Sequence, residues 1–323
     1  MLMYFKFPLN DVKAFMSINE EWPFELFCES LTYDLFSTHW EVRHGAAIGL
    51  REVLRQHAGG AGRTPGMDTA QQEGATQRYL EDIALRTTCV LALDKFGDFV
   101  SDEVVAPVRE SCAQALGIVL SVMREDAVVS VMNILITLLR QEQWEARHGA
   151  LLGLKYLLAV RKELTAKLLP EVFPSVFAGL QDSCDDVSAV SAAALAPVAD
   201  DIVNFLPDQV TSLITCLWDL LLDLDDLTAA TNSMMSLLSS LLANSHVSYT
   251  HRGAELHELV PRLWPFLGHS IKSVRRSALA TLQTLVAMEN TEPPVNVWLP
   301  QVLQEALRTL FQRCIVESNQ ETQ

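Results

Sequence analysis

An eleven-residue segment that occurs twice constrains this chain more than any other feature. It reads WEVRHGAAIGL from Trp40 and WEARHGALLGL from Trp144, and eight of the eleven positions are identical. Both copies place apolar residues at the three- and four-residue spacing of an amphipathic helix. A helix that occurs twice in one chain repeats either a ligand site or a packing unit. The rest of the sequence distinguishes these two interpretations.

The spacing of related segments favours a packing unit. Six segments can be aligned on a residue pair that follows a polar turn, and successive pairs lie 66, 38, 41, 40 and 47 residues apart. The pairs are Val42-Arg43, Val108-Arg109, Ala146-Arg147, Val187-Ser188, Leu227-Thr228 and Val274-Arg275. Such a period is typical of helical hairpins that bury their apolar faces against their neighbours. The sequence therefore predicts an all-α fold, a HEAT-type α-solenoid in which six antiparallel hairpins and a lone last helix form a curved array.

The longest interval contains a stretch that is poor in apolar residues. Residues 57–77 include five glycines and the sequence RTPG, so we expect a flexible insertion without a helical face, followed by a helix from Leu80 to Phe96. The other expected boundaries are an atypical extension at 1–18, a repeat at 19–56, further repeats at 78–318 that end in a half-repeat, and a tail at 319–323. The half-repeat leads us to expect a fragment of a longer protein.

The repeated residues have structural interpretations. We expect Trp40 in the core, with Trp144 as its repeat, and glycines where a neighbouring backbone approaches closely, at Gly45, Gly49, Gly149 and Gly153. The repeated arginines could form a phosphate ladder, but pairing with turn carboxylates of the same or the adjacent hairpin is favoured, at Arg43, Arg109, Arg147 and Arg275. His44 and His148 have no second metal ligand at i+4, which favours interface histidines over a metal site.

Charge and motifs argue against several function classes. A net charge of −16 opposes general affinity for nucleic acid or anionic lipid and favours a basic partner. The chain lacks GxxxxGK[ST], GxSxG and HExxH, and its GDFVSDE stretch lacks a calcium-loop pattern. Its six cysteines form no CxxC pair and are typical of reduced, buried thiols. We therefore expect no enzyme activity, cofactor, metal, membrane span or small-molecule substrate in this chain.

The acidic residues gather at the predicted turns. Stacked hairpins bring their turns to one edge, so these residues would form a negatively charged ridge suited to a basic partner, although some must cap helices or pair with the repeated arginines. Besides Glu41, the ridge comprises Asp98, Asp102, Glu103, Glu142, Glu145, Asp182, Asp185, Asp186, Asp223, Asp225 and Asp226.

Long strings of the sequence resemble one family of transcription regulators. They include NEEWPFELFCESLTYDLFSTHWEVRHGAAIGLREVL, FGDFVSDEVVAPVRESCAQALGIVL, QEQWEARHGALLGLKYLLAVR and LWDLLLDLDDLTAATNSMMSLLSSLL. In these strings the chain is similar to the TATA-binding-protein-associated factors, Swi/Snf-superfamily ATPases that remove TATA-binding protein from promoter DNA. The resemblance runs from Asn19 to Ser318 and does not include residues 1–18.

The resemblance implies a nuclear protein whose HEAT array grips TATA-binding protein. The ATPase motifs of the family are absent from this sequence, so the chain would be a binding piece that meets promoter DNA only indirectly. The family's partner has a basic convex face, and we hypothesise that the acidic ridge contacts it. Two alternatives remain open, a generic helical adaptor or importin-like scaffold for a basic partner, and a nucleic-acid-binding HEAT protein, which the acidic balance disfavours.

Overall fold

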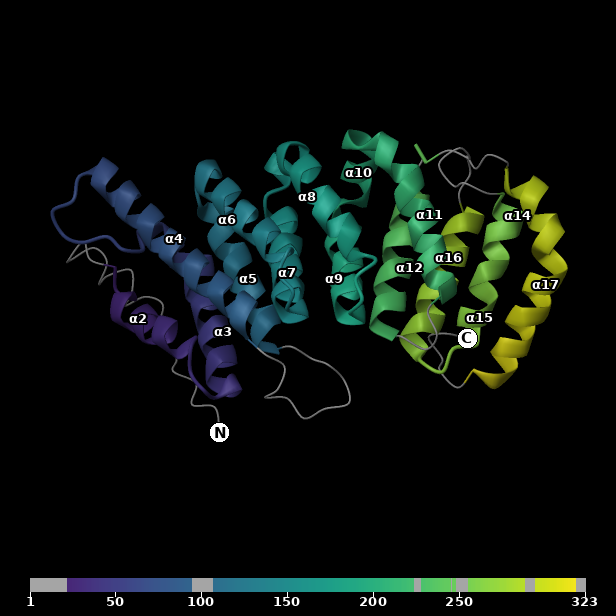
Figure 1. Ribbon diagram of the computed structural model, residues 1–323, viewed down its shortest axis with the longest axis horizontal. Helices are drawn as coiled ribbons and strands as arrows, with labels where there is room; N and C mark the ends of the chain where they lie inside the picture. The colour runs from purple at the N-terminus through teal and green to yellow at the C-terminus, as the bar shows by residue number, and fades with distance from the viewer. Residues whose placement is uncertain are drawn as a thin grey trace. The chain divides into compact units, whose positions relative to one another are not determined.

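All regular structure in the described part of the chain is helical. The computed structural model describes residues 22–94, 107–223, 228–244, 246–247, 255–287 and 294–317. Within these ranges every element is an α-helix or a 3-10 helix (Figure 1). The chain divides into two compact units, Met1–Arg161 and Lys162–Gln323, each built from packed helices. The predicted all-α class is confirmed.

The first unit contains three pairs of consecutive helices. They are α2 (Glu25–Asp34) with α3 (Trp40–His57), α4 (Thr69–Leu93) with α5 (Pro107–Val122), and α6 (Glu125–Leu138) with α7 (Trp144–Val160). The two helices of each pair pack on each other, and the second helices α3, α5 and α7 pack in that order. A short 3-10 helix, η1 (Ala58–Gly60), follows α3. This is the hairpin stacking of a solenoid.

The second unit stacks its helices in the same way, and some of them are only one or two turns long. Its elements are η3 (Lys162–Leu164), α8 (Thr165–Gly179), α9 (Asp185–Leu195), η4 (Ala196–Val198), α10 (Ala199–Phe205), α11 (Pro207–Asp223), α12 (Thr228–Ala243), α14 (Leu256–Leu259), η5 (Val260–Leu263), α15 (Trp264–Leu267), α16 (Lys272–Ala287) and α17 (Val295–Val316). Here α9, α12 and α16 pack in succession as second helices, and α17 packs against α14 and α15.

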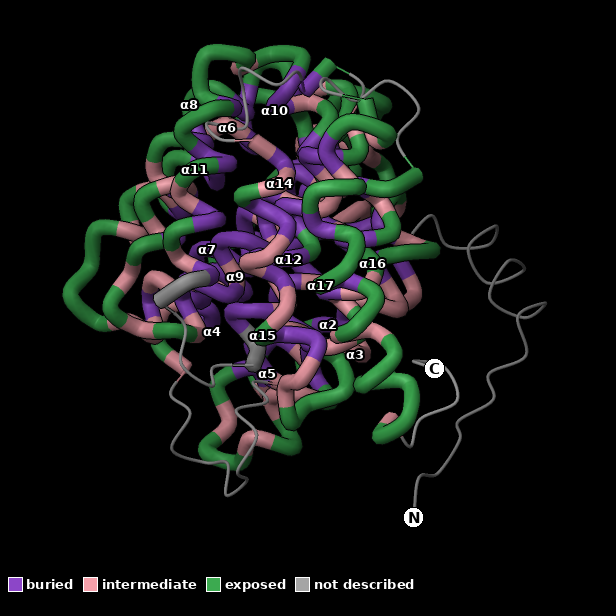
Figure 2. The backbone as a smooth tube through the Cα atoms, turned by 90° about the vertical axis from the view of Figure 1, so that its right-hand side faces the viewer, coloured by how far each residue is buried: buried purple, intermediate pink, exposed green. Residues whose placement is uncertain are grey.

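The core lies where the helices face each other. On α3, Ala46, Ala47, Leu50 and Leu54 recur at helical spacing and are buried, whereas the outward faces of the helices are exposed (Figure 2). The expectation that Trp40 lies in the core is wrong: its side chain is only half-buried, because it occupies the first residue of α3, beside the turn.

The glycine-rich segment contains more helix than expected. Helix α4 begins at Thr69, and both Ala75 and Gln77 are buried, so part of residues 57–77 has a packed helical face. A capping box starts the helix: the Gln71 backbone amide donates to Asp68 Oδ1 at 2.8 Å, and the Asp68 amide donates to Gln71 Oε1 at 3.0 Å.

The turn that precedes α4 uses glycine for its backbone conformation. Gly62 and Gly66 have φ angles of 69° and 84°, which side-chain-bearing residues rarely adopt. Trp22 Nε1 donates to the carbonyl of His57 at 3.1 Å, so the buried indole holds the end of α3 next to this turn. High glycine content here serves a defined turn and close packing; the remaining domain boundaries stay predictions.

Candidate protein-interaction surface

Three of the repeated arginines hold the turns that precede second helices, and one of these turns carries the acidic residue Glu142. Arg43, Arg147 and Arg275 each occupy the fourth position of a second helix, and Nη1 of each donates to two carbonyls of the preceding turn. The acceptors are Ser37 and Thr38 at 2.9 and 3.2 Å, Gln141 and Glu142 at 3.0 and 2.7 Å, and His269 and Ser270 at 2.9 and 2.9 Å. Carbonyls at the end of a helix lack intrahelical donors, and the guanidinium supplies them.

Two of these arginines also reach a carboxylate of the next hairpin. Arg43 Nη2 lies 2.9 Å from Asp94 Oδ1, at the end of α4. Arg275 forms a two-pronged pair with Glu317 after α17, with Nε to Oε2 at 2.7 Å and Nη2 to Oε1 at 3.0 Å. A fork of this kind is the pairing that the sequence analysis favoured over a phosphate ladder, and it links adjacent hairpins.

Arg109 is a fully buried variant of the same device. Its Nε lies 3.8 Å from Asp94 Oδ2, and its Nη1 donates to the carbonyls of Leu91 (3.0 Å) and Glu145. Burial lowers the pKa of Arg109 to about 10, partly offset by Asp94 and Glu145, so the guanidinium is charged at neutral pH. This buried guanidinium therefore joins α5, which carries Arg109, to α4 and α7.

The repeated glycines meet different neighbours. A Cβ atom placed on Gly149 would lie 1.9 Å from the carbonyl oxygen of Leu91, so α4 approaches this backbone closely. At Gly49 and Gly153 the nearest atoms belong to leucine side chains, at 2.9 and 2.8 Å. For Gly45 the expected close approach is wrong, since no described atom would lie within 4 Å of such a Cβ. Within the described residues no hairpin precedes α2, so no helix packs against Gly45 as α4 packs against Gly149.

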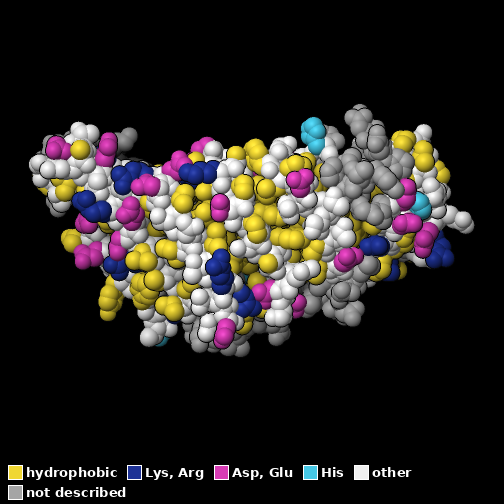
Figure 3. Space-filling view, turned by 45° about the horizontal axis from the view of Figure 1, so that its top comes forward, with side chains coloured by type: hydrophobic (Ala, Val, Ile, Leu, Met, Phe, Trp, Pro, Cys, Tyr) yellow, Lys and Arg dark blue, Asp and Glu magenta, His cyan; other side chains and the backbone are white. Residues whose placement is uncertain are grey.

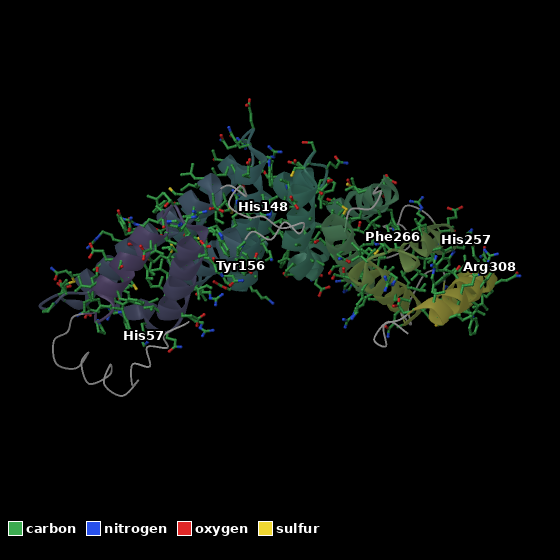
Figure 4. The ribbon with its side chains drawn as sticks, turned by 90° about the horizontal axis from the view of Figure 1, so that it is seen from below. His57, His148, Tyr156, His257, Phe266 and Arg308 are labelled. Atoms are coloured by element: carbon green, nitrogen blue, oxygen red, sulfur yellow. The ribbon has the colours of Figure 1, made fainter. Side chains whose placement is uncertain are left out.

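The two repeated histidines lie at helix interfaces. His44 Nδ1 lies 3.0 Å from the Pro107 carbonyl oxygen and 3.1 Å from Ser111 Oγ, so it joins α3 to α5. His148, labelled in Figure 4, is buried on α7; burial, with Arg109 and Lys155 nearby, lowers its pKa to about 3. Across the described ranges, no group of three or more His, Cys, Asp or Glu side chains has the arrangement of a metal site.

A polar cluster that the sequence analysis missed joins the second helices α3, α5 and α7. Gln114 Nε2 donates to Glu110 Oε1 at 3.1 Å and to the Tyr156 hydroxyl at 3.2 Å, and Arg51 donates to Gln114. Tyr156 (Figure 4) donates to Glu110, and burial together with this hydrogen bond raises its pKa to about 12. Members of the cluster are far apart in the sequence, so only the stacking order of the helices brings them together.

Five of the described acidic residues of the predicted ridge lie at or next to two turns, one in each unit. Glu142 lies between α6 and α7 and is exposed, and Glu145, the second residue of α7, is half-buried. Between α8 and α9, the Cys184 amide donates to Asp182 Oδ1 at 2.9 Å, while Asp185 is exposed. Burial, together with the neighbouring charge of Asp185, raises the pKa of Asp186. Asp182 thus has a turn-forming role, whereas Glu142 and Asp185 are exposed and available to a partner.

The other acidic residues of the predicted ridge lie outside these two turns. Glu41 is exposed in the first turn of α3, and Asp223 is the last residue of α11. Asp98, Asp102, Glu103, Asp225 and Asp226 lie outside the described residues. On the face shown in Figure 3, Asp and Glu side chains are interspersed with Lys and Arg. None of the described helices combines the length and the apolar character that a membrane-spanning segment needs.

Comparison with known proteins gives strong matches in sequence. No protein-family model matches the chain. It is 50% identical over 313 residues, 97% of its length, to TATA-binding protein-associated factor 172 of Homo sapiens. It is 41% identical over 320 residues to TATA-binding protein-associated factor mot1 of Aspergillus fumigatus, covering 94% of the chain. In both comparisons the chain spans 17% of the relative's length.

Solved structures share the fold. The Mot1 N-terminal domain, determined in complex with TBP, has a TM-score of 0.57 at 20% identity, covering 80% of this chain and 30% of that one. Kap121p bound to Pho4p has a TM-score of 0.64 at 13% identity, covering 94% and 30%. These likenesses confirm the helical solenoid. In sequence and over nearly its whole length, the chain is a relative of one segment of the TATA-binding protein-associated factors.

Proposed function

We propose that this chain is a HEAT-repeat module that binds TATA-binding protein, within a regulator that dissociates that protein from promoter DNA. The observation that carries the proposal is the 50% identity over 97% of the chain to a relative named for association with TATA-binding protein. The fold supports it, since a stack of hairpins presents an extended surface from rigid elements.

The proposed contact is made by the acidic turns. Glu142 and Asp185 are exposed, and the turn of Glu142 is held by Arg147 through two carbonyls, so this carboxylate projects from an ordered loop. Fixed negative charges on a chain of net charge −16 would steer a basic partner and orient it. The acids outside the described residues belong to the same proposal.

In this proposal the chain itself neither catalyses a reaction nor contacts promoter DNA directly. The chain corresponds to 17% of their length and its sequence lacks the phosphate-binding motif GxxxxGK[ST]. We therefore propose a non-enzymatic binding segment that acts in the nucleus. The purified chain should hydrolyse no ATP, with or without TATA-containing DNA.

Binding can be tested with matched charge variants. The turn variant carries Glu142→Lys and Asp185→Lys; the control carries Glu29→Lys and Glu171→Lys, which change the same charge at exposed helix positions, one in each unit. Against immobilised TATA-binding protein, the turn variant should bind about tenfold more weakly at low salt, a loss of about 1.4 kcal/mol, while the control keeps most of its affinity. Circular dichroism checks that both variants are folded.

The possible outcomes separate the function from the site. If the wild-type chain captures no TATA-binding protein at micromolar concentration, the proposed function is wrong. If the wild type binds and both variants weaken equally, the function stands and the acidic turns are not the contact. A basic protein such as lysozyme, tested in parallel, distinguishes a dedicated partner from the general basic-partner adaptor of the alternative interpretation.

A further inference from the structure

An open groove of about 290 Å³ runs between the first helices α4 and α6 in the first unit. One wall carries Glu81, Leu85 and Thr88 from α4, and the other carries Asp126, Ala127 and Ile134 from α6. Asp126 lies at the start of α6, whereas the acidic turn at Glu142 follows the end of that helix. The groove is therefore separate from the proposed contact with TATA-binding protein, and binding there would not depend on that contact.

Small side chains create the hollow. Ala84, Thr88 and Ala127 are buried at positions where α4 faces α6, and they are too short to fill the space between the two helices. Leu85 and Ile134 stand at the rim and are 55% and 43% exposed. Covering these side chains would remove apolar surface from water, which favours binding.

One end of the groove is acidic. Gln77 on α4 donates to Glu81 Oε1 at 2.8 Å and accepts from the Arg124 amide at 3.1 Å. These bonds tie the middle of α4, near Glu81, to the start of α6. Asp126 therefore lies at the same end. Its pairing with Arg124 is loose, with 3.8 Å between Arg124 Nε and Asp126 Oδ1, and such an exposed pair contributes little. The groove lining includes two carboxylates and no Lys or Arg.

We infer that this groove binds an amphipathic helix of a protein partner. Two apolar side chains of the partner, one helical turn apart, would lie between Leu85 and Ile134, and a lysine or arginine one turn away would pair with Glu81 and Asp126. Laying an apolar helix face into a groove between helices is a general mode of peptide recognition. The charged end distinguishes this partner from a purely apolar one and fixes the direction of the bound helix.

The test uses three fluorescein-labelled helical peptides and the full chain. Two carry leucines at i and i+4 with a lysine pair either one turn before or one turn after them, and the third carries glutamates in place of the lysines. Fluorescence anisotropy should show one basic peptide binding at least tenfold more tightly than the acidic one. Absence of binding by both basic peptides at about 100 μM, or equal binding by the acidic one, overturns the inference.

Variants locate the binding site. Leu85→Glu and Ile134→Glu should each abolish binding of the basic peptide, and Glu81→Gln with Asp126→Asn should remove its advantage over the acidic peptide. Leu26→Glu on α2, at an 80% exposed leucine, is the matched control and should leave binding unchanged. Equal loss in the control overturns the inference, as does a wild-type dimer in sedimentation that Leu85→Glu abolishes, because the occupant would then be a second copy of the chain.

Discussion

At the residue scale, the two copies of the repeated segment show that identical residues can have different roles. Gly149 faces the carbonyl of Leu91, while Gly45 is exposed and has no described atom near its Cβ direction. The sequence predicts a helix interface at both glycines. Only Gly149 has one, because α4 packs against it. Asp94 was missed for a related reason. A single acid at a helix end has no local signal, and its role depends on two arginines from other elements.

The first prediction compares these two glycines. Gly149→Ala forces a methyl group against a backbone carbonyl and should lower the free energy of unfolding by about 1–3 kcal/mol. Gly45→Ala adds a methyl group in open space and should raise the stability of α3 by up to about 1 kcal/mol. Thermal unfolding followed by circular dichroism measures both. Equal effects of the two substitutions would show that α4 does not approach α7 as closely as the structure indicates.

The second prediction concerns His148 and pH. Burial first, then Arg109 and Lys155, lower its pKa to about 3, whereas an unfolded histidine has a pKa of about 6.5. Between these values the unfolded state binds the additional proton, so the contribution is complete above about pH 6.5 and is lost as the pH falls. From pH 7.5 to 5.5, His148→Gln should lose up to about 1.4 kcal/mol less stability than the wild type in urea unfolding. Parallel pH profiles would contradict the buried neutral histidine.

At the element scale, helix α4 shows what local sequence patterns miss. Its first part has few apolar residues and a glycine at position 74, so the hydrophobic periodicity becomes visible only near Leu80. The capping pair Asp68 and Gln71 was present in the sequence and marks the helix start. Ala75 is buried, so this part of α4 is packed, although its glycine content predicts a flexible segment.

The third prediction tests this helix start. Asp68→Ala removes the side-chain acceptor at the N-terminus of α4 and should destabilise that end by about 1 kcal/mol. Limited trypsin digestion of the wild type should cut after Arg63, in the turn, before it cuts after Arg78, inside the helix. In the variant, cleavage after Arg78 should accelerate. Early cleavage after Arg78 in the wild type would instead support the flexible insertion that the composition predicts.

The fourth prediction concerns the connection between the first two hairpins. Asp94→Asn leaves the fully buried Arg109 and the nearly buried Arg43 without their shared carboxylate. Removing one partner of a buried charge pair costs several kcal/mol, and we expect about 3 kcal/mol because Arg109 keeps its carbonyl acceptors. The control Asp82→Asn breaks an exposed pair with Arg86 on the same helix and should cost less than about 0.5 kcal/mol. Similar unfolding midpoints for the two variants would contradict the buried role of Asp94.

At the scale of the whole molecule, the repeat period was enough to predict the class of fold, because each hairpin repeats the same packing problem. Helix pairs in both units follow the aligned segments, and the second helices stack in order within each unit. The candidate surface was less accessible to sequence reasoning. Acidic residues at one turn differ in exposure, as Asp185 and Asp186 do. That difference depends on the residues packed around the turn.

The last prediction follows from the local character of such a stack. Stability in a solenoid is approximately a sum of repeat and nearest-neighbour contributions, so a defect should spread only to adjoining hairpins. We therefore expect Asp94→Asn to accelerate amide hydrogen exchange in α3, α5 and α7, which Arg43 and Arg109 join to the end of α4. Exchange in α12 and α16 of the second unit should keep its wild-type rate, measured by mass spectrometry on peptides from each helix. Equal acceleration in all five helices would mean that the two units open as one cooperative body, and that stability in this chain is not the local sum that its repeats predict.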